Sequence, residues 1–462
     1  MSETISTLAS GVWTPVLFLL ILGGVFFLLY SRFIPYKYIG HSIAILRGKY
    51  NNPDDPGQIN AYEALSTALA STVGMGNIAG VAAAIAIGGP GALFWMWIAA
   101  IVGMSTNFFT STLSVMFKGK DSAGEIQGGP MYVIREALSR PWYPLAVLFC
   151  LCASIGCLPI FQANQLTQII IDIGITDEKV KNASFYIGSF EVNGAKFVIG
   201  CILMIISGFV IIGGIQRIGK WAGKMVPLMI IIYFLLVLTI LLINIAKVPS
   251  YFSMIFTDAF AADHYHGDPL LGGIVGGLIV TGVRRAAFSN EAGIGTAPMA
   301  LGASKSREPI REGLVSMLSP AIDTLLVCTL TALSILVTDV WRTTDANGVS
   351  LTVKAFESTL GGTGKFLLLV SAFFFAITSL FSYSYYGNKA LSFLFGVGAG
   401  KYYNYFYLVT IVFGAILSMQ DIMNIIDVAY ALMAIPTMVS GFILAPKVMR
   451  EAKSYFRRMR ES

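Results

Sequence analysis

The residues near position 74 have types and a spacing that suit the binding of a small charged molecule. The segment STVGMGN at 71–77 places two glycines and an amide side chain in the middle of an apolar stretch. Glycine lets a helix open at low cost, and the freed backbone groups are tolerated at membrane depth only where they face protein, a ligand or water. A broken helix offers N–H groups that suit a carboxylate and carbonyl groups that suit a cation. An amino-acid zwitterion needs both, although paired glycines also allow simple close packing of helices.

A second glycine-rich segment lies five apolar stretches further on. Residues 276–285 read GGLIVTGVRR and are followed by FSNEAG at 288–293. Two interrupted helices at corresponding places in two five-helix halves are typical of transporters built from inverted repeats. We therefore expect this stretch to be interrupted near its glycines.

Amide and hydroxyl side chains occur in two further apolar stretches. Gln162 and Asn164 follow Pro159, and they can serve either a ligand or the hydrogen bonds that join membrane helices. Thr378 and Ser379 lie beside a group of phenylalanines. Hydroxyl oxygens combined with backbone carbonyls suit a hard cation such as sodium, but they also bond back to their own helical turn.

Three charged residues would be costly to hold inside a membrane. Arg284, Arg285 and Glu291 all follow the second glycine-rich segment. Charges at that depth usually pair with one another or lie on a substrate path. We expect one of the arginines to pair with Glu291, or with a carboxylate such as Asp323 or Glu63, and to act in a gate.

The composition identifies the elements that must position these residues. Of 462 residues, 56% are hydrophobic and 12% are charged, and the mean hydropathy is +0.73. This composition predicts an all-α polytopic membrane protein and argues against several soluble domains. The net charge of +6 is modest and gives no reason to expect nucleic-acid binding.

Eleven stretches are long and apolar enough to span a membrane, which takes about 20 residues. We predict spans at 12–31, 64–87, 91–116, 143–173, 197–215, 225–246, 271–299, 314–338, 364–386, 402–418 and 425–446. They form one membrane domain, in which 12–31 is an extra helix, 64–246 is a first five-helix repeat and 271–446 is a second.

The placement of lysine and arginine predicts the orientation. With these spans, 22 basic residues fall on one side and 7 on the other, while Arg284 and Arg285 lie within a span. Basic residues near span ends accumulate on the cytoplasmic side. We therefore expect the N-terminus outside and the C-terminus in the cytoplasm of a cell membrane.

Several motifs together resemble a known family. The runs GPGALFWMWIAAIVG at 89–103 and FSNEAGIGTAP at 288–298 are similar to two signatures of the sodium:alanine (alanine or glycine:cation) symporter family, and GGPMY at 128–132 and YYGNKAL at 385–391 extend the similarity over most of the chain. The sequence departs from its relatives at Asn388, where they usually have glutamate. The resemblance implies the LeuT-type fold, with five-plus-five inverted repeats.

The resemblance also implies roles for individual residues. A sodium site would comprise the carbonyls of Ala70, Val73 and Phe375 with the hydroxyls of Thr378 and Ser379. The glycines of the first break would meet the carboxylate of the substrate. Thr72 and Asn77 would serve either the substrate or a second cation. The full set of substrate contacts would comprise Thr72, Gly74, Met75, Gly76, Asn77, Gln162, Asn164, Thr281, Gly282 and Phe375.

These expectations favour a symporter that takes up alanine or glycine together with sodium by alternating access, with sodium as coupling ion and no other cofactor. A pocket lined by aromatic residues and glycine should admit only small side chains. A channel would need polar groups along a whole pore, and an enzyme would need a nucleophile with a base or a metal cluster, and the sequence indicates neither. The remaining alternative is coupling to protons, or a sodium-coupled carrier of another small amino acid; the oligomeric state stays open.

Overall fold

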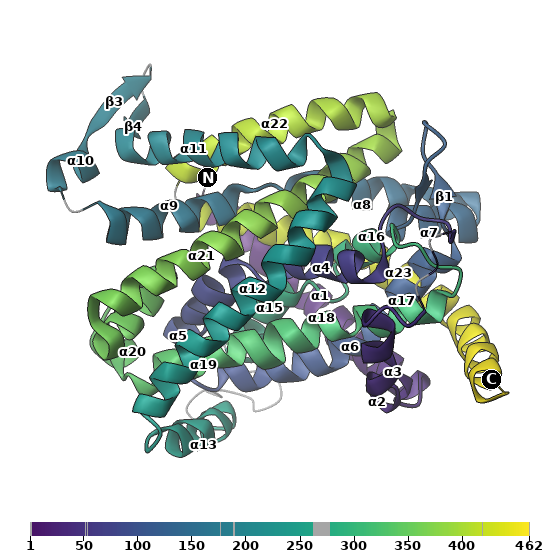
Figure 1. Cartoon of the computed structure of the whole chain (residues 1–462), viewed down its shortest axis with the longest axis horizontal. Helices are drawn as coiled ribbons and strands as arrows, with labels where there is room; N and C mark the ends of the chain where they lie inside the picture. Colours follow the sequence, from purple (N-terminus) through teal and green to yellow (C-terminus); the bar gives the residue numbers. More distant parts are fainter. Residues whose placement is uncertain are drawn as a thin grey trace.

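Long helices follow from the apolar stretches, because a chain in hydrocarbon must satisfy its backbone hydrogen bonds within each segment. The computed structural model describes residues 2–50, 52, 54–175, 177–187, 190–261, 278–417 and 419–461, with the side chains of all of these except 2–10, 187, 190 and 419–425. Most of the long helices run between two opposite ends of the molecule, which carry the short helices and hairpins (Figure 1).

The helices and strands have the following bounds: α1 (Ser2–Tyr30), α2 (Ile34–Lys37), α3 (Ile39–Leu46), α4 (Ala61–Thr72), η1 (Gly76–Gly80), α5 (Val81–Gly88), α6 (Ala92–Met116), β1 (Gly119–Lys120), β2 (Ile126–Gln127), α7 (Pro130–Ala137), η2 (Arg140–Trp142), α8 (Tyr143–Gly156), α9 (Ile160–Gly174), α10 (Glu178–Asn182), β3 (Ser184–Ile187), β4 (Phe190–Asn193), α11 (Gly194–Ile211), α12 (Gly214–Ile243), α13 (Val248–Ala259), α15 (Leu278–Asn290), α16 (Thr296–Leu301), α17 (Pro309–Ser316), α18 (Leu318–Pro320), η4 (Ala321–Cys328), α19 (Thr329–Val337), α20 (Val340–Thr343), α21 (Val349–Phe395), α22 (Val397–Ile416) and α23 (Met419–Glu461).

The helices agree with a protein that crosses a membrane many times. Among the described residues, eight helices are long and apolar enough to span one, and the bent pair α4 and α5 makes a ninth. The all-α polytopic class is therefore confirmed. The predicted spans at 271–299 and 402–418 correspond to α15–α16 and α22, but residues 271–277 lie outside the described part of the chain. The count of eleven stays a prediction.

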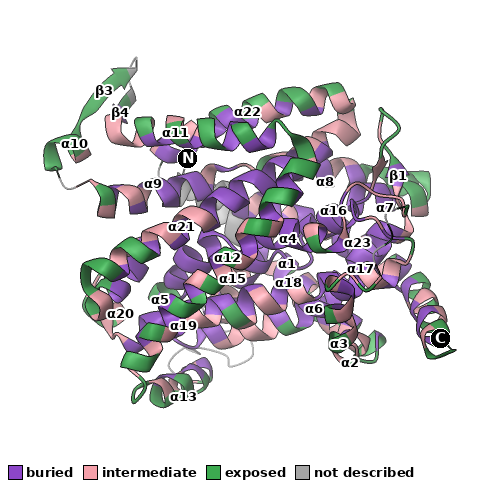
Figure 2. Cartoon of the chain, in the orientation of Figure 1, coloured by how far each residue is buried: buried purple, intermediate pink, exposed green. Residues whose placement is uncertain are grey.

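Burial separates a packed interior from a lipid-facing rim. Buried residues concentrate in α4, α6, α15 and the middle of α21 (Figure 2). The outer helices expose large apolar side chains, such as Phe209, which is 72% exposed, and Ile205, which is 69% exposed. Exposed apolar surface of this kind is unfavourable in water and is expected where a helix meets lipid.

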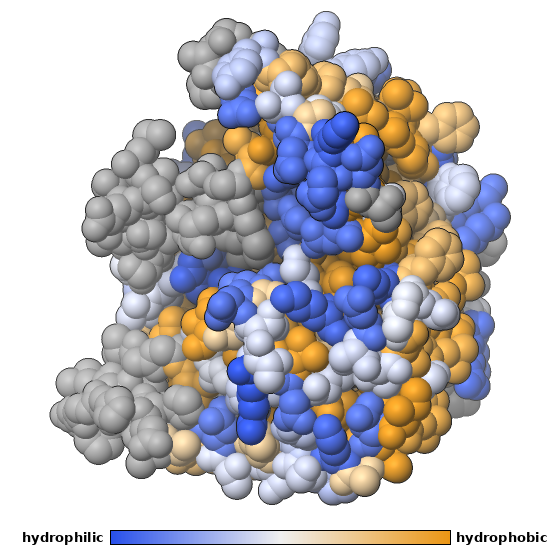
Figure 3. Space-filling view, turned by 90° about the vertical axis from the view of Figure 1, so that its left-hand side faces the viewer, coloured by the Kyte–Doolittle hydropathy of each residue, from blue (hydrophilic) through white to orange (hydrophobic). Residues whose placement is uncertain are grey.

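The two ends of the molecule are polar. The end that carries α10, α13, α20 and the antiparallel hairpin β3–β4 shows hydrophilic side chains across its centre, with apolar ones toward one edge (Figure 3). The other end carries α2, α3, α7 and the antiparallel hairpin β1–β2 (Figure 1). Polar ends and an apolar girdle are what a membrane-embedded bundle requires.

Helix α1 lies outside the predicted repeats and packs mainly on α23 and α6. The ring of Phe27 stacks on Phe109 of α6 and on Phe442 of α23, with centroid separations of 4.6 and 5.1 Å. The extra helix is thus fixed to the bundle by aromatic packing.

Candidate binding site at the broken helices

Helix α4 ends where the sequence predicted a break. Val73 leaves the helical conformation with ψ near 82°, and the chain bends by 47° before it continues as the π-helical turn η1 and α5. The N–H of Gly74 donates to Oδ1 of Asn77 at 2.9 Å, and the N–H of Met75 donates to Oε1 of Gln162 at 2.9 Å. Two side-chain oxygens therefore replace the helical acceptors at the break.

This replacement frees carbonyl groups at the end of α4. In an unbroken helix the N–H groups of residues 74 and 75 would bond to the carbonyls of Ala70 and Ser71. Helix α21 brings the buried Ser379 hydroxyl to the same place: its Oγ lies 3.4 Å from the Ser71 carbonyl and 3.0 Å from the Phe375 carbonyl. Thr378 Oγ1 lies 3.1 Å from the Phe375 carbonyl. The structure thus gathers neutral oxygens from both helices.

Glycine is required where these two helices approach each other. A Cβ atom at Gly74 would collide with the Ser379 hydroxyl and would lie 3.2 Å from both polar atoms of the Gln162 amide. At Gly76 the nearest atoms belong to Phe288 and Ser289, 3.7 Å away, which is ordinary van der Waals contact. Gly74 is therefore needed for close approach of α21, whereas Gly76 leaves room for a methyl group.

A buried carboxylate adjoins the break on its other side. Asp323, which is 0% exposed, lies in the π-helical segment η4, and irregular turns of this kind are frequent at functional sites. Its oxygens accept from Asn77 Nδ2 at 2.7 Å, Ser289 Oγ at 2.8 Å and Thr324 Oγ1 at 2.8 Å. Three neutral donors thus surround it, and the expectation that it pairs with an arginine is wrong. The sequence analysis noted Ser289 only as part of the polar run that follows the second glycine-rich segment, and it did not predict the contact with Asp323.

Among the described residues, the helix that follows the second glycine-rich segment is interrupted after Asn290. Helix α15 is continuous to Asn290, and α16 begins at Thr296. The break between them contains Glu291, Gly293 and Gly295, with φ angles of 54°, 83° and 111°. Left-handed backbone ends a helix, and glycine adopts it without the steric cost of a side chain. The conformation of these residues therefore accounts for the break between α15 and α16, while the predicted interruption at the glycines 276 and 277 lies outside the described residues.

The predicted contributions of Thr281 and Gly282 are not brought to the breaks. Both residues lie inside α15, and a Cβ atom at Gly282 would lie 2.6 Å from the carbonyl oxygen of Ala92 on α6. Gly282 thus serves close helix packing. The glycines at 276 and 277, which were part of the same prediction, lie outside the described residues.

The intramembrane arginine has a partner that the sequence did not indicate. Arg284 forms an ion pair with Asp427 of α23, and the side chains are 21% and 1% exposed. Glu63 is instead engaged in a capping box at the start of α4, where it exchanges hydrogen bonds with Asn60. The expected pairing with Glu291, Asp323 or Glu63 is wrong, because the Arg284 guanidinium binds Asp427, which lies 143 residues away in sequence.

Glu291 is held by tyrosines. Its Oε1 accepts hydrogen bonds from Tyr383 of α21 at 2.5 Å and from Tyr430 of α23 at 3.1 Å. The two hydroxyls are themselves 3.1 Å apart. This cluster joins the break between α15 and α16 to two neighbouring helices.

Several predicted polar residues have structural partners away from the first break. Asn164 donates both amide hydrogens to α22, to the carbonyls of Gly414 at 3.1 Å and Leu417 at 2.7 Å. Asn388 joins α21 to α22 through the Gly400 carbonyl at 2.7 Å. Thr72 bonds back to its own turn. Of the predicted amides, the structure therefore brings Asn77 and Gln162 to the break, but not Asn164.

Comparison with known proteins agrees with this geometry. The sodium:alanine symporter family model matches residues 1–462. The sodium/alanine symporter AgcS of Methanococcus maripaludis is 34% identical over 98% of this chain and 96% of its own length, and a transporter of Haemophilus influenzae is 35% identical over 100% and 97%.

A solved structure of low sequence identity shows the fold. The crystal structure of MhsT in complex with L-phenylalanine superposes with a TM-score of 0.60 at 13% identity, and the match covers 84% of this chain and 89% of MhsT. This match confirms the expected LeuT-type fold. The chain belongs to the sodium:alanine symporter family, and it is a multi-pass membrane protein that carries amino acids together with a cation rather than an enzyme.

Proposed function

We propose that this protein couples the entry of sodium to the uptake of a small neutral amino acid, alanine or glycine. The observation that carries the proposal is the diversion of the Gly74 and Met75 amides at the first break. Because of that diversion, one short segment presents carbonyls toward α21 and N–H groups beside them. A cation and a carboxylate can then bind side by side.

The proposed sodium site consists of neutral oxygens. The carbonyls of Ala70, Val73 and Phe375 and the hydroxyls of Thr378 and Ser379 come from the end of α4 and the middle of α21, which pack against each other. Hard, neutral oxygen ligands suit a cation of low charge. In the structure the hydroxyls bond to carbonyls of their own turn, and sodium would take over those oxygens.

The proposed substrate site adjoins the same break. The carboxylate of the amino acid would replace the side-chain oxygens of Asn77 and Gln162 at the N–H groups of residues 74–76. The ring of Phe288 limits the space, since it lies next to Gly76 and packs edge to face on Phe161 with centroids 4.9 Å apart. Little room for added methylene groups supports alanine and glycine over larger substrates. Within the predicted set, Asn164, Thr281 and Gly282 would then act on helix packing rather than on the substrate.

The proposed mechanism is alternating access. Both ligands share the broken helix α4–α5, so that binding of the cation favours the conformation that accepts the amino acid, by differential affinity. The excess of basic residues at one end supports an orientation with the N-terminus outside and the C-terminus in the cytoplasm of the cell membrane. A thiol-reactive label directed at a cysteine introduced in the C-terminal tail of oriented vesicles tests this orientation.

Proton coupling is the alternative, and Asp323 is the observation that favours it. Its carboxylate is buried among neutral donors, and a buried charge without a counter-charge is costly. Either a bound cation or a proton removes that cost. Asp323→Asn mimics the protonated form, so it would abolish coupling to protons but leave a sodium-driven cycle able to operate.

The test measures uptake of labelled alanine, and separately of labelled glycine, into liposomes that contain the purified protein. One set has an inward sodium gradient, one has choline in its place, and one has a pH gradient alone. The double variant Thr378→Ala with Ser379→Ala is compared with Ser371→Ala, a matched control because the Ser371 hydroxyl bonds only within its own turn of α21, at 2.9 Å from the Leu367 carbonyl.

We expect uptake only with the sodium gradient. The double variant should lose this uptake, and the control variant should keep it. Uptake driven by the pH gradient in choline would show that protons, rather than sodium, are the coupling ion. Failure of alanine and glycine to be taken up in any of the three conditions would refute the substrate assignment.

A further inference from the structure

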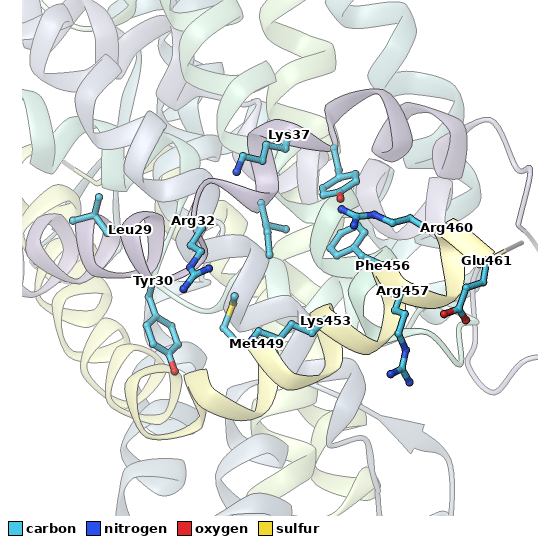
Figure 4. A pocket seen from close by; sticks show the side chains of 12 residues that line it. Leu29, Tyr30, Arg32, Lys37, Met449, Lys453, Phe456, Arg457, Arg460 and Glu461 are labelled. Atoms are coloured by element: carbon cyan, nitrogen blue, oxygen red, sulfur yellow. The ribbon is translucent and has the colours of Figure 1, made fainter.

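A basic groove lies at the end of the molecule opposite the face in Figure 3. It has a volume of about 710 Å³ and is formed by the end of α1, the turn into α2 and the last turns of α23. Arg32 projects from the α1–α2 turn toward α23, and Met449 and Lys453 lie across from it (Figure 4). We call this the α1–α23 groove.

The charge of the α1–α23 groove is strongly one-sided. Five cations line it against a single carboxylate, Glu461, which leaves a formal charge of +4 (five minus one). The cations are Arg32, Lys37, Lys453, Arg457 and Arg460, and all five are exposed. Within the described part of the chain, no ion pair engages any of them, whereas the neighbouring Arg458 pairs with Glu308 on the other side of α23. The groove is therefore open to an anionic ligand.

The remaining lining of the groove is apolar. Leu29 and Tyr30 are the last residues of the span in α1, and Met449 follows the predicted span 425–446 on helix α23. Tyr38 and Phe456 also line the groove, and their rings stack with centroids 3.9 Å apart and an interplanar angle of 16°. Cations thus adjoin an apolar surface at the point where both spans leave the membrane.

The backbone at the groove is strained. Arg32 and Phe33 are consecutive non-glycine residues with φ angles of 52° and 60°. Left-handed backbone is unfavourable for such residues, and it persists only where the surroundings hold it. This turn is what places the Arg32 guanidinium over the groove instead of extending α1.

We propose that the α1–α23 groove binds the phosphodiester headgroup of an anionic phospholipid. The basic side chains would hold the phosphate, and the acyl chains would lie against the apolar side chains of α1 and α23. Basic pockets between membrane helices at the cytoplasmic surface are known to bind such headgroups. A nucleic acid or an acidic peptide would satisfy the charge but would leave the apolar surface at the membrane boundary uncovered. This inference rests on the membrane class alone and does not depend on the choice of substrate or ion.

The test measures lipid binding to the purified full-length protein by native mass spectrometry. Dioleoyl phosphatidylglycerol is compared with dioleoyl phosphatidylcholine, and glycerol phosphate is the arm that carries the phosphate without acyl chains. The groove variant is Lys453→Gln, Arg457→Gln and Arg460→Gln together. The matched control removes the same charge from exposed sites outside the groove, as Lys220→Gln, Lys224→Gln and Lys401→Gln.

The parent protein is expected to bind phosphatidylglycerol at least tenfold more tightly than phosphatidylcholine. Each basic group near an anionic lipid surface contributes a factor of about five, so that the groove variant should lose affinity by up to about 100-fold, whereas the control should change by less than about threefold. A variant with Lys453→Arg, Arg457→Lys and Arg460→Lys together keeps the charge and should keep the preference for phosphatidylglycerol.

Three results would overturn the proposal. The first is equal binding of both lipids by the parent. The second is equal loss in the groove variant and in the control, which would show a general surface-charge effect. The third is binding of glycerol phosphate as tight as that of the lipid, which would assign the groove to a soluble phosphate compound.

Discussion

Replacing Gly74 by alanine should weaken the response to sodium, because the added methyl group occupies the space between α4 and α21. The Cβ atom would collide with the Ser379 hydroxyl and would lie 3.2 Å from the Gln162 amide. Forcing one extra carbon into a packed interior costs about 1–3 kcal/mol. To make room, α21 must move away or the Ser379 hydroxyl must rotate. Either change removes an oxygen from the proposed site, and the same energy corresponds to a loss of sodium affinity of about 5-fold to 150-fold.

Gly76→Ala is the matched control for this prediction. Its methyl group would meet Phe288 at an ordinary contact distance of 3.7 Å, so the sodium dependence should stay within about twofold of the parent. The assay is the sodium concentration that gives half-maximal alanine uptake, measured in liposomes at equal protein content. If Gly74→Ala and Gly76→Ala respond alike to sodium, the close approach of α21 to the break has no part in cation binding.

Three further predictions concern residues away from the first break. Asp427→Asn should leave the Arg284 guanidinium unpaired and lower the free energy of unfolding by about 3–5 kcal/mol. Adding Arg284→Gln should restore part of that free energy. Strictly additive losses in the double variant would contradict the pairing. Asn164→Ala removes two hydrogen bonds to α22, which should cost about 1–3 kcal/mol of stability while the alanine KM stays unchanged, and a raised KM would instead support the predicted substrate role. Burial and nearby cations lower the pKa of His41 from its usual 6.5, so the unfolded chain binds more protons near pH 6 than the folded protein does. The free energy of unfolding should therefore fall as the pH drops through 6.5. Thermal melts of His41→Gln should lack this part of the pH dependence.

The first break and its hydroxyl partners could be predicted from the sequence because their signals are local. Two glycines within three residues inside an apolar stretch indicated the opening after Thr72, and a Thr-Ser pair among phenylalanines indicated polar groups in a buried helix. The structure shows both and places Ser379 of that pair against the Ser71 carbonyl at the end of α4. The all-α membrane class followed from composition in the same way, since it depends on a sum over many residues.

The pairs of charged and polar groups could not be predicted, because they depend on which helices become neighbours. Arg284 and Asp427 are separated by 143 residues, and Asn77 and Asp323 by 246. Nothing in a single sequence indicates such partners. The break between α15 and α16 was not predicted for another reason: it depends on left-handed residues around Glu291, whereas the sequence argument relied on the glycines earlier in the stretch.

The hydrogen bond between Met75 and Gln162 has a consequence for biogenesis. During synthesis Met75 emerges 87 positions before Gln162. Until α9 arrives, only one of the two acceptors at the bend is in place, because Asn77 lies in the segment itself and Gln162 does not. The Met75 N–H can then bond only within its own segment. Truncated chains that stop before α9 should therefore insert with a bend that is only partly fixed, and the docking of α9 would complete it.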